Sequence, residues 1–444
     1  MVVLLSIIYV VLLIYAAKAF SREEGYYSTI TIFGVGCFLY YISIPLEMSL
    51  LGITEHIKDA FVIKLTQTQA VAIVAMGLMA FCSFTFGYRL SSFSPFICQI
   101  QFDPGSKAFC VYSIAIIVVA SVFIEVLFYY DNIKMSGSYI SSSLLHYNEP
   151  VFTLLANLIV LFSSVAGAAL MSEKNFKNKI LGVVLVLAIV SWGIYSSDKN
   201  VILIGALACA SRLFNISRKQ GIGALLVIFG GIILVVYLVK FFSLYRGGHS
   251  ISSALTMALT QFGARFIDPL GPFVSLSNAI NSVESYQCGK TYMEILYLIV
   301  PRFIWNARPP DISEQFAMDN IHNWVPSEGM GFSPLAESYI NFSFIGPFIQ
   351  YFILGLTWGL FWKWLRRILW YYPSHYWNSM YYVIGFYFLI LVHRGPISSL
   401  LKPLFHTFTV LFLLVFCIDL LIIGLRRRGI LQSFIFMTKR SNDI

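Results

Sequence analysis

Long apolar stretches recur along the chain, separated by short segments that hold most of its charged residues. A bilayer-spanning helix needs about 20 predominantly apolar residues, because the hydrocarbon core is roughly 30 Å thick. Eleven stretches are candidates: 2–20, 28–50, 69–88, 108–130, 151–171, 180–196, 200–215, 222–244, 337–362, 378–393 and 401–424. The apolar run near 292–300 offers a twelfth. The pattern predicts an all-α polytopic membrane helix bundle of about 11–12 spans.

The polar segments divide the chain into four parts. We expect an N-terminal transmembrane bundle, a long exterior loop, C-terminal transmembrane helices and a basic tail, at 1–244, 245–336, 337–425 and 426–444. The first stretch lacks the basic flank and small-residue cleavage site of a signal peptide, so it predicts a retained helix. Within the loop, apolar residues recur at helical spacing over 251–266, which predicts a short amphipathic helix in the interface plane. Ser313 is suited to cap a second short helix.

Composition and charge support a membrane protein. Hydrophobic residues make up 58% of the 444 and charged residues 11%, against about a quarter charged in soluble domains. Eighteen of the 30 Lys and Arg residues lie on alternate short segments and the tail, which the positive-inside rule places in the cytoplasm. The N-terminus and the long loop are then outside. The net charge of +9 is thus explained by topology and by anionic membrane lipids as partners, with no need for nucleic acid.

Five arginines on the outer side run against the positive-inside trend: Arg246, Arg265, Arg302, Arg308 and Arg394. Arginine suits bidentate binding of phosphate, so we expect these residues to bind a diphosphate. The seven cysteines form no CxxC pattern, and no DxD or HExxH spacing is present, so we predict neither a metal nor a cofactor. Anchoring at the interface and simple ion pairs remain the alternative roles of these arginines.

A reaction that uses an acceptor hydroxyl needs a nearby base. Glu337, at the beginning of a span, is the first candidate and His322 the second. The aromatic residues Trp305, Trp324 and Tyr339 are candidates for stacking on sugar faces. The alternatives are a helix-dipole role for the glutamate and an interfacial belt for the aromatic residues.

Two segments of the loop resemble a known family. The segment PRFIW-x-x-RPP and the following GFSPLAESYINFSFIG are similar to the bacterial O-antigen (oligosaccharide repeat-unit) polymerases of the Wzy family, as is the layout of the whole chain. Arg302 and Arg308 match the basic positions of that pattern and Glu337 its carboxylate. Asn306 stands where relatives often have proline, and Ser343 where they often have glycine.

The resemblance implies a metal-independent, GT-C-like glycosyltransferase of the bacterial inner membrane, with its N-terminus and active site periplasmic and its C-terminus cytoplasmic. It would join undecaprenyl-diphosphate-linked oligosaccharide repeat units and release undecaprenyl diphosphate. A chain-length regulator and a flippase of the same pathway are expected partners. An O-antigen ligase that uses lipid A–core as acceptor is the close alternative, and a lipid-linked oligosaccharide flippase or transporter is the alternative from a different class.

Overall fold

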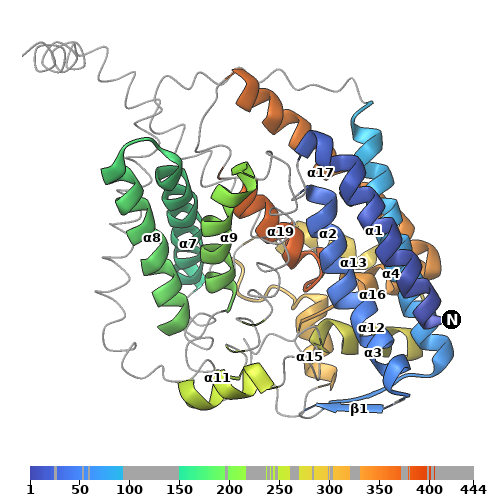
Figure 1. The fold of residues 1–444 in the computed structure, drawn as a ribbon. Helices are drawn as coiled ribbons and strands as arrows, with labels where there is room; N and C mark the ends of the chain where they lie inside the picture. The colour runs from blue at the N-terminus through green and yellow to red at the C-terminus, as the bar shows by residue number, and fades with distance from the viewer. Residues whose placement is uncertain are drawn as a thin grey trace, which may run out of the picture.

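The computed structural model of the chain is largely helical (Figure 1). It describes residues 1–24, 28–52, 55–58, 61–93, 150–195, 199–216, 237, 241, 244–245, 249–260, 270–282, 285–298, 300, 304–320, 331–371, 379, 381–397, 400–401 and 405. The predicted all-α architecture is confirmed, with one small addition. A β-hairpin that the apolar pattern does not indicate joins two of the helices, and its strands pair Glu55 with Lys64 and Lys58 with Phe61.

The first group of elements runs from the N-terminus to residue 91. It comprises α1 (Val2–Glu24), α2 (Thr29–Cys37), the π-helix η1 (Phe38–Ile42), α3 (Ser43–Leu51), β1 (Glu55–Lys58), β2 (Phe61–Lys64) and α4 (Gln67–Ser91). Thr66 and Gln69 form a reciprocal capping box at the beginning of α4, which satisfies backbone N–H groups that the helix leaves open. A membrane helix therefore begins at a defined residue directly after the hairpin.

The remaining elements follow from residue 150 onward. They are α7 (Pro150–Ser172), α8 (Phe176–Tyr195), α9 (Lys199–Ile216), α11 (Ile251–Thr260), α12 (Leu270–Ser282), α13 (Lys290–Met293), α14 (Ile295–Leu298), α15 (Ile312–Asn320), α16 (Pro334–Phe342), the 3₁₀ turn η2 (Ser343–Ile345), α17 (Gly346–Tyr371), the π-helix η3 (Tyr381–Gly385) and α19 (Phe386–Leu391).

Five helical segments in the described part of the chain are long and apolar enough to cross a membrane. They are Val2–Phe20, Thr29–Leu51, Gln67–Ser91, Phe176–Gly193 and Pro334–Arg366. These match predicted stretches, and the shorter apolar helices Ile159–Ser172 and Tyr381–Leu391 match two more. The predicted stretch 108–130, most of 222–244 and most of 401–424 lie outside the described residues.

One prediction about the later spans needs correction, and another needs refinement. The run near 292–300 contains two four-residue helices, α13 and α14, rather than a twelfth span. The stretch 337–362 lies within the span Pro334–Arg366, but η2 divides that span into α16 and α17. At 1.5 Å per residue, the 26 residues of α17 extend about 39 Å, enough to cross the hydrocarbon core without α16.

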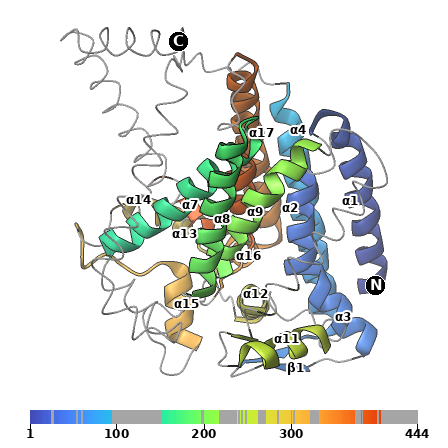
Figure 2. The ribbon, with the colours of Figure 1, turned by 60° about the vertical axis from the view of Figure 1, so that its left-hand side comes forward.

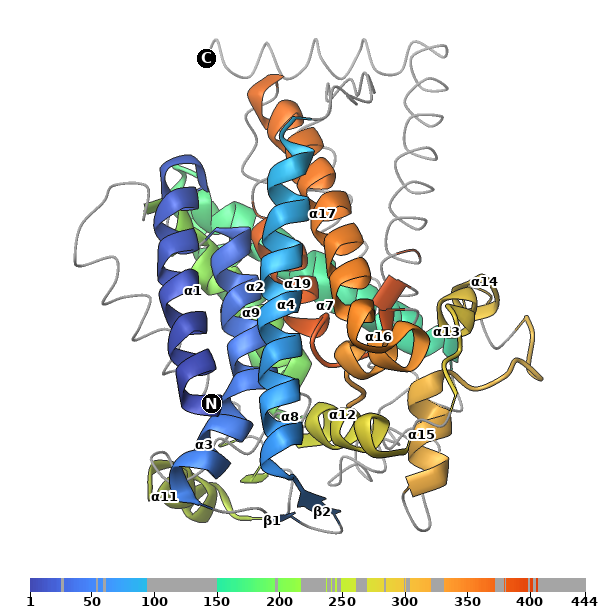
Figure 3. The ribbon, with the colours of Figure 1, turned by 90° about the vertical axis from the view of Figure 1, so that its right-hand side faces the viewer.

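Helices α4 and α17 pack side by side along a seam of small residues (Figure 3). Cβ atoms added at Gly87 and Gly355 would lie 2.3 Å from the Phe352 carbonyl oxygen and 2.1 Å from that of Phe84. Gly355 and Gly359 have the small-x-x-x-small spacing that lets membrane helices approach closely. The seam joins the N-terminal helices to the C-terminal half of the chain.

A second unit consists of α7, α8 and α9, which lie next to one another (Figures 1 and 2). Gly167 and Gly182 face each other where α7 meets α8, each close to the other's backbone oxygen. This unit is connected to the rest of the bundle through Val383, Ile384 and Phe388, which belong to its apolar core. The apolar core that contains residues of α1, α2, α4 and α17 also contains residues of the loop elements α12, α15 and α16.

The two ends of the bundle differ in character. The hairpin, α11, α12 and α15 gather at one end, while α4 and α17 end at the other (Figures 1 and 3). At that second end Lys363 donates a hydrogen bond to the Ser92 carbonyl at 3.0 Å, and Arg366 acts electrostatically on buried Glu24. The amphipathic helix predicted in the loop is present as α11. Its Ala254 and Ala258 are buried, while Ile251, Leu255 and Leu259 are exposed.

Candidate active site around Glu337

The short helix α16 carries Glu337, and both of its ends are set by local sequence. Ser333 caps the beginning by accepting a hydrogen bond from the Ala336 N–H, and Pro334 occupies the first turn, where its missing N–H has no cost. The helix ends before Ser343, whose φ of 57° and ψ of −149° lie in a region that side chains rarely adopt. A Cβ added at Gly346 would lie 1.9 Å from the Ser338 carbonyl oxygen, so α17 begins folded closely against α16.

Glu337 is fully buried, and both of its carboxylate oxygens accept hydrogen bonds. Oε1 accepts from the hydroxyl of Thr291 on α13 at 3.1 Å. Oε2 accepts from the backbone N–H of Ile397 at 2.7 Å. The side chain therefore joins three segments that are more than 45 residues apart in the sequence.

Asn341, one turn after Glu337 on the same helix, extends this network. Its Nδ2 donates to the Thr291 hydroxyl at 2.6 Å and to the Glu337 carbonyl at 2.8 Å, and its Oδ1 accepts from the Gly289 N–H at 2.9 Å. A buried amide with these groups satisfied is orienting rather than costly. The segment that leads into α13 is thereby fixed on α16.

The turn 392–397 reaches Glu337 from the other side. The side chain of His393 is fully buried, and its ring lies 4.9 Å from that of Phe33 and 5.5 Å from that of Tyr41, measured between centroids. Its Nδ1 is 3.3 Å from the Tyr41 hydroxyl. Residue 394, one of the predicted phosphate-binding arginines, follows directly and is half-buried. His393 and Glu337 thus hold the two sides of the turn that contains Arg394.

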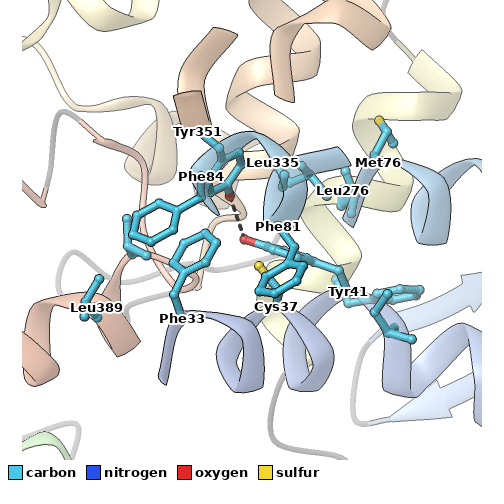
Figure 4. Packing of buried hydrophobic residues seen from close by; sticks show 14 of the residues in the cluster. Phe33, Cys37, Tyr41, Met76, Phe81, Phe84, Leu276, Leu335, Tyr351 and Leu389 are labelled. Carbon is cyan, nitrogen blue, oxygen red and sulfur yellow. Dashed lines mark hydrogen bonds between the residues drawn. The ribbon is translucent and has the colours of Figure 1, made fainter. Parts of the chain in front are cut away.

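Tyr41 lies on the π-helix η1, where the wider turn interrupts the α-helical register of a spanning segment. Such π-turns are frequent at functional sites. The Tyr41 hydroxyl also meets that of Tyr351 on α17 at 3.0 Å within the aromatic core (Figure 4). Phe33 and Phe84 stack beside this pair with ring centroids 3.7 Å apart. The aromatic core therefore packs against the His393 ring of the 392–397 turn.

Arg308 is the one predicted phosphate-binding arginine of the loop whose side chain the structure describes. It is buried, and its Nη1 donates hydrogen bonds of 2.9 Å to the carbonyls of Leu298 and Val300. These carbonyls lie at and just after the end of α14, where backbone acceptors are left open. The observed contacts of Nη1 therefore hold the loop together.

A second buried carboxylate, Glu294, lies between α13 and α14. It accepts a hydrogen bond of 3.2 Å from the N–H of Ile312, while Asp311 caps α15 by accepting from the Glu314 N–H. Asp311, rather than Ser313, is thus the observed cap of this helix. Burial raises the pKa of Glu294 to about 7, and the nearby Asp311 charge adds to this, while the Ile312 bond and Lys290 act in the opposite direction.

The raised pKa of Glu294 predicts a pH-dependent stability. The folded state holds this proton up to about pH 7, whereas the unfolded chain releases it near the ordinary glutamate pKa of 4.5, so folding loses stability as the pH rises between these values. We expect Glu294→Gln to raise the free energy of unfolding at pH 8 by an amount on the order of 2 kcal/mol, seen as a higher unfolding temperature in detergent. The difference from wild type should vanish near pH 4.5. An equal effect at both pH values would contradict this account.

The conformation of Ser343 predicts a stabilising substitution. Its backbone occupies a region that is essentially restricted to glycine, at a cost of about 1–3 kcal/mol. Ser343→Gly removes this strain but also the hydrogen bond from the Ser343 hydroxyl to Tyr286. We therefore expect the free energy of unfolding to rise by about 1 kcal/mol, measured by thermal unfolding. Ser343→Ala is the control, since it keeps the Cβ atom and loses only the hydroxyl. Stabilisation by alanine as well would show that strain is not the cause.

The structure places some of the predicted site residues and leaves others outside its described part. The turn that contains Arg394 contacts Glu337 through the Ile397 N–H, while Trp305 is exposed and its ring meets that of Tyr297 edge-on. Tyr339 is buried, with its ring packed against those of Tyr286 and Phe344. The predicted residues outside the described part are Arg246, Arg265, Arg302, His322 and Trp324.

Three residues of the site carry little sequence signal: Thr291, Asn341 and His393. Thr291 and Asn341 are uncharged and lie in segments where single polar residues are common, so neither residue stands out in the sequence. His393 stands beside Arg394 in an otherwise apolar stretch, so a histidine at the end of a span was the one signal available.

Comparison with protein families gives a match over nearly the whole chain. A family model described as O-antigen polysaccharide polymerase Wzy matches residues 1–428. No curated protein and no solved structure matches the chain. The family match includes the described spans, α16 with Glu337, and the 392–397 turn. Because it covers nearly the whole sequence, the chain belongs to the O-antigen polysaccharide polymerase family Wzy.

Proposed function

We propose that this O-antigen polymerase is a glycosyltransferase that joins undecaprenyl-diphosphate-linked oligosaccharide repeat units and releases undecaprenyl diphosphate. The observation that carries the proposal is the hydrogen bond from the Ile397 N–H to Glu337, which brings the arginine-containing turn against α16. A fixed cation beside a buried polar network is what a departing diphosphate requires when no metal takes its charge. The chemistry is therefore the transfer of a glycosyl group from a lipid diphosphate to a sugar hydroxyl, with the lipid diphosphate as leaving group.

The residues receive their roles from the contacts of Glu337 and from the charge pattern of the sequence. Arg394 binds the diphosphate, together with Arg246, Arg265 and Arg302 of the outer segments. Glu337 holds the turn, because both of its oxygens are engaged and none of its surface is exposed. His322, the second candidate from the sequence, then accepts the proton of the acceptor hydroxyl.

The orientation of the protein follows from its charges. Lys363 and Arg366 lie at the end of the bundle opposite the hairpin, α12 and α15. Positive residues favour the cytoplasmic side, so we place the Glu337 end at the periplasmic face of the inner membrane, with a periplasmic N-terminus and a cytoplasmic C-terminus. A flippase would deliver the substrate to this face, and a chain-length regulator would act on the growing product there.

A deletion strain tests the proposed function directly. Its lipopolysaccharide should carry single repeat units, and the full-length chain supplied in trans should restore the ladder. Purified protein given lipid-linked repeat units without lipid A–core should still form polymers. A requirement for lipid A–core would identify a ligase instead. Movement of labelled lipid-linked oligosaccharide across liposomes, without a new glycosidic bond, would identify a transporter.

A further inference from the structure

An exposed tyrosine lies close to the Glu337 network and has no role in the proposed reaction. Tyr286, on the segment between α12 and α13, is 48% exposed. The side chains that follow it at Gln287 and Lys290 are polar and exposed as well. Phe344, which packs against Tyr339, is exposed too, so the ring lies where polar and apolar surface meet.

The Tyr286 ring is held in one orientation. It packs edge-on against the buried ring of Tyr339, with centroids 6.1 Å apart and an interplanar angle of 83°. Its hydroxyl oxygen accepts a hydrogen bond of 3.0 Å from the Ser343 hydroxyl, and this bond, together with the nearby Tyr339 hydroxyl, lowers the pKa of Tyr286. The phenolic O–H can itself donate one hydrogen bond.

The segment that carries Tyr286 is fastened to α16. The N–H groups of Gln287 and Cys288 donate to the carbonyls of Ile340 and Asn341, at 3.0 and 3.1 Å. Asn341 in turn bonds the Glu337 backbone and accepts from the Gly289 N–H. The position of the ring is therefore coupled to the site by a continuous set of hydrogen bonds.

Two residues beside the ring adopt backbone conformations that are costly for any residue but glycine. Cys288 has a φ of 49° and Ser343 a φ of 57°. Strain of this kind persists where the surrounding structure imposes it, and it clusters at sites that hold ligands. In Ser343 the strained backbone directs the hydroxyl to Tyr286. The strained backbone thus helps to hold the exposed Tyr286 ring in place. Packing of the apolar core does not require this position.

We propose that Tyr286 is a glycan-binding residue whose ring stacks on a sugar of the repeat unit and whose hydroxyl donates to that sugar. The inference rests on the proposed function and adds a substrate subsite to it. A pyranose presents an apolar C–H face with a polar rim, which a tyrosine held in place matches with its ring and its hydroxyl. Tyr339, the predicted stacking residue, supports this ring from beneath.

The test measures binding of the free repeat-unit oligosaccharide, released from its lipid, to the purified full-length protein. Saturation-transfer NMR reports contact, and inhibition of polymerisation by the same oligosaccharide reports affinity. We expect Tyr286→Leu to weaken inhibition about tenfold and Tyr286→Phe to weaken it less. Tyr15→Leu, at an exposed tyrosine of α1, is the matched control and should behave as wild type.

The outcomes separate this proposal from the proposed function. If wild-type protein forms no polymer from lipid-linked repeat units, the proposed function fails. If wild type polymerises and Tyr286→Leu binds the oligosaccharide normally, the glycan subsite is wrong. Weaker inhibition of Tyr286→Leu by undecaprenyl phosphate, with unchanged inhibition by the oligosaccharide, would assign the ring to lipid and also overturn the proposal. Unfolding temperatures of each variant show whether the fold is retained.

Discussion

Replacing Glu337 with alanine should abolish the lipopolysaccharide ladder and leave only single repeat units. The substitution removes the acceptor of the Ile397 N–H and of the Thr291 hydroxyl in a fully buried place. Each buried donor left unpaired costs about 1–3 kcal/mol, and the cavity adds to this. The turn with Arg394 then loses its attachment to α16. We expect a fall in polymerisation of at least about 100-fold, measured with purified protein and lipid-linked repeat units.

The Glu337→Gln substitution distinguishes a residue that only holds the turn from a catalytic base. Its amide oxygen can accept from the Ile397 N–H and its NH₂ group can face Thr291, so a residue that only holds the turn should tolerate it. We therefore expect Glu337→Gln to retain most of the activity. A folded Glu337→Gln protein as inactive as the alanine variant would instead make the carboxylate the catalytic base. The negative charges of Asp311 and Glu294 disfavour a negative charge on Glu337, so an uncharged glutamine at this position should not disturb the fold.

A methyl group at Gly355 should have the largest effect on stability. The added Cβ would lie 2.1 Å from the Phe84 carbonyl oxygen and 2.8 Å from the carbonyl carbon, and backbone cannot yield as a side chain can. Helices α4 and α17 would have to separate along the seam. We expect Gly355→Ala to lower the free energy of unfolding by about 3 kcal/mol. The unfolding temperature in detergent is the measurement.

Gly385→Ala provides the matched control for that substitution. A Cβ at Gly385 would meet its nearest atoms, in Trp358 and Tyr381, at 3.5 Å, which is an ordinary contact. This variant should unfold close to the wild-type temperature. Similar unfolding temperatures for Gly355→Ala and Gly385→Ala would mean that α4 and α17 are further apart than the structure places them. Loss of the ladder should accompany the unfolding of Gly355→Ala, since α16 is built on α17.

Most of the fold could be predicted because the helices that cross a bilayer are long and apolar. Residues 2–20 and 69–88 have no other plausible solvent than hydrocarbon. The break at Ser343 has no such signal, because Phe344 and Ile345 continue the apolar run and serine is tolerated in helices. What ends α16 is the tertiary approach of Gly346 to Ser338, which no local pattern contains.

The candidate site shows the same division. Charge identified Glu337 and Arg394, since ionisable groups near a membrane are few. Their connection depends on the backbone N–H of Ile397, and every residue except proline has that group. Thr291 and Asn341 are equally silent, because a threonine or asparagine becomes informative only when its partners are known. Arg308 was predicted from charge alone, and its described contacts are with backbone carbonyls.

The glycine seam also has a consequence for biosynthesis. Helix α4 ends at residue 91 and its partner α17 begins at residue 346. At about 5–20 residues per second, the ribosome needs roughly 13–50 s to produce the intervening chain. Throughout that interval the small-residue face of α4 lies in the membrane without its partner. Newly made protein is therefore open to proteolytic quality control until translation is almost complete, and the rate of synthesis helps to set its yield.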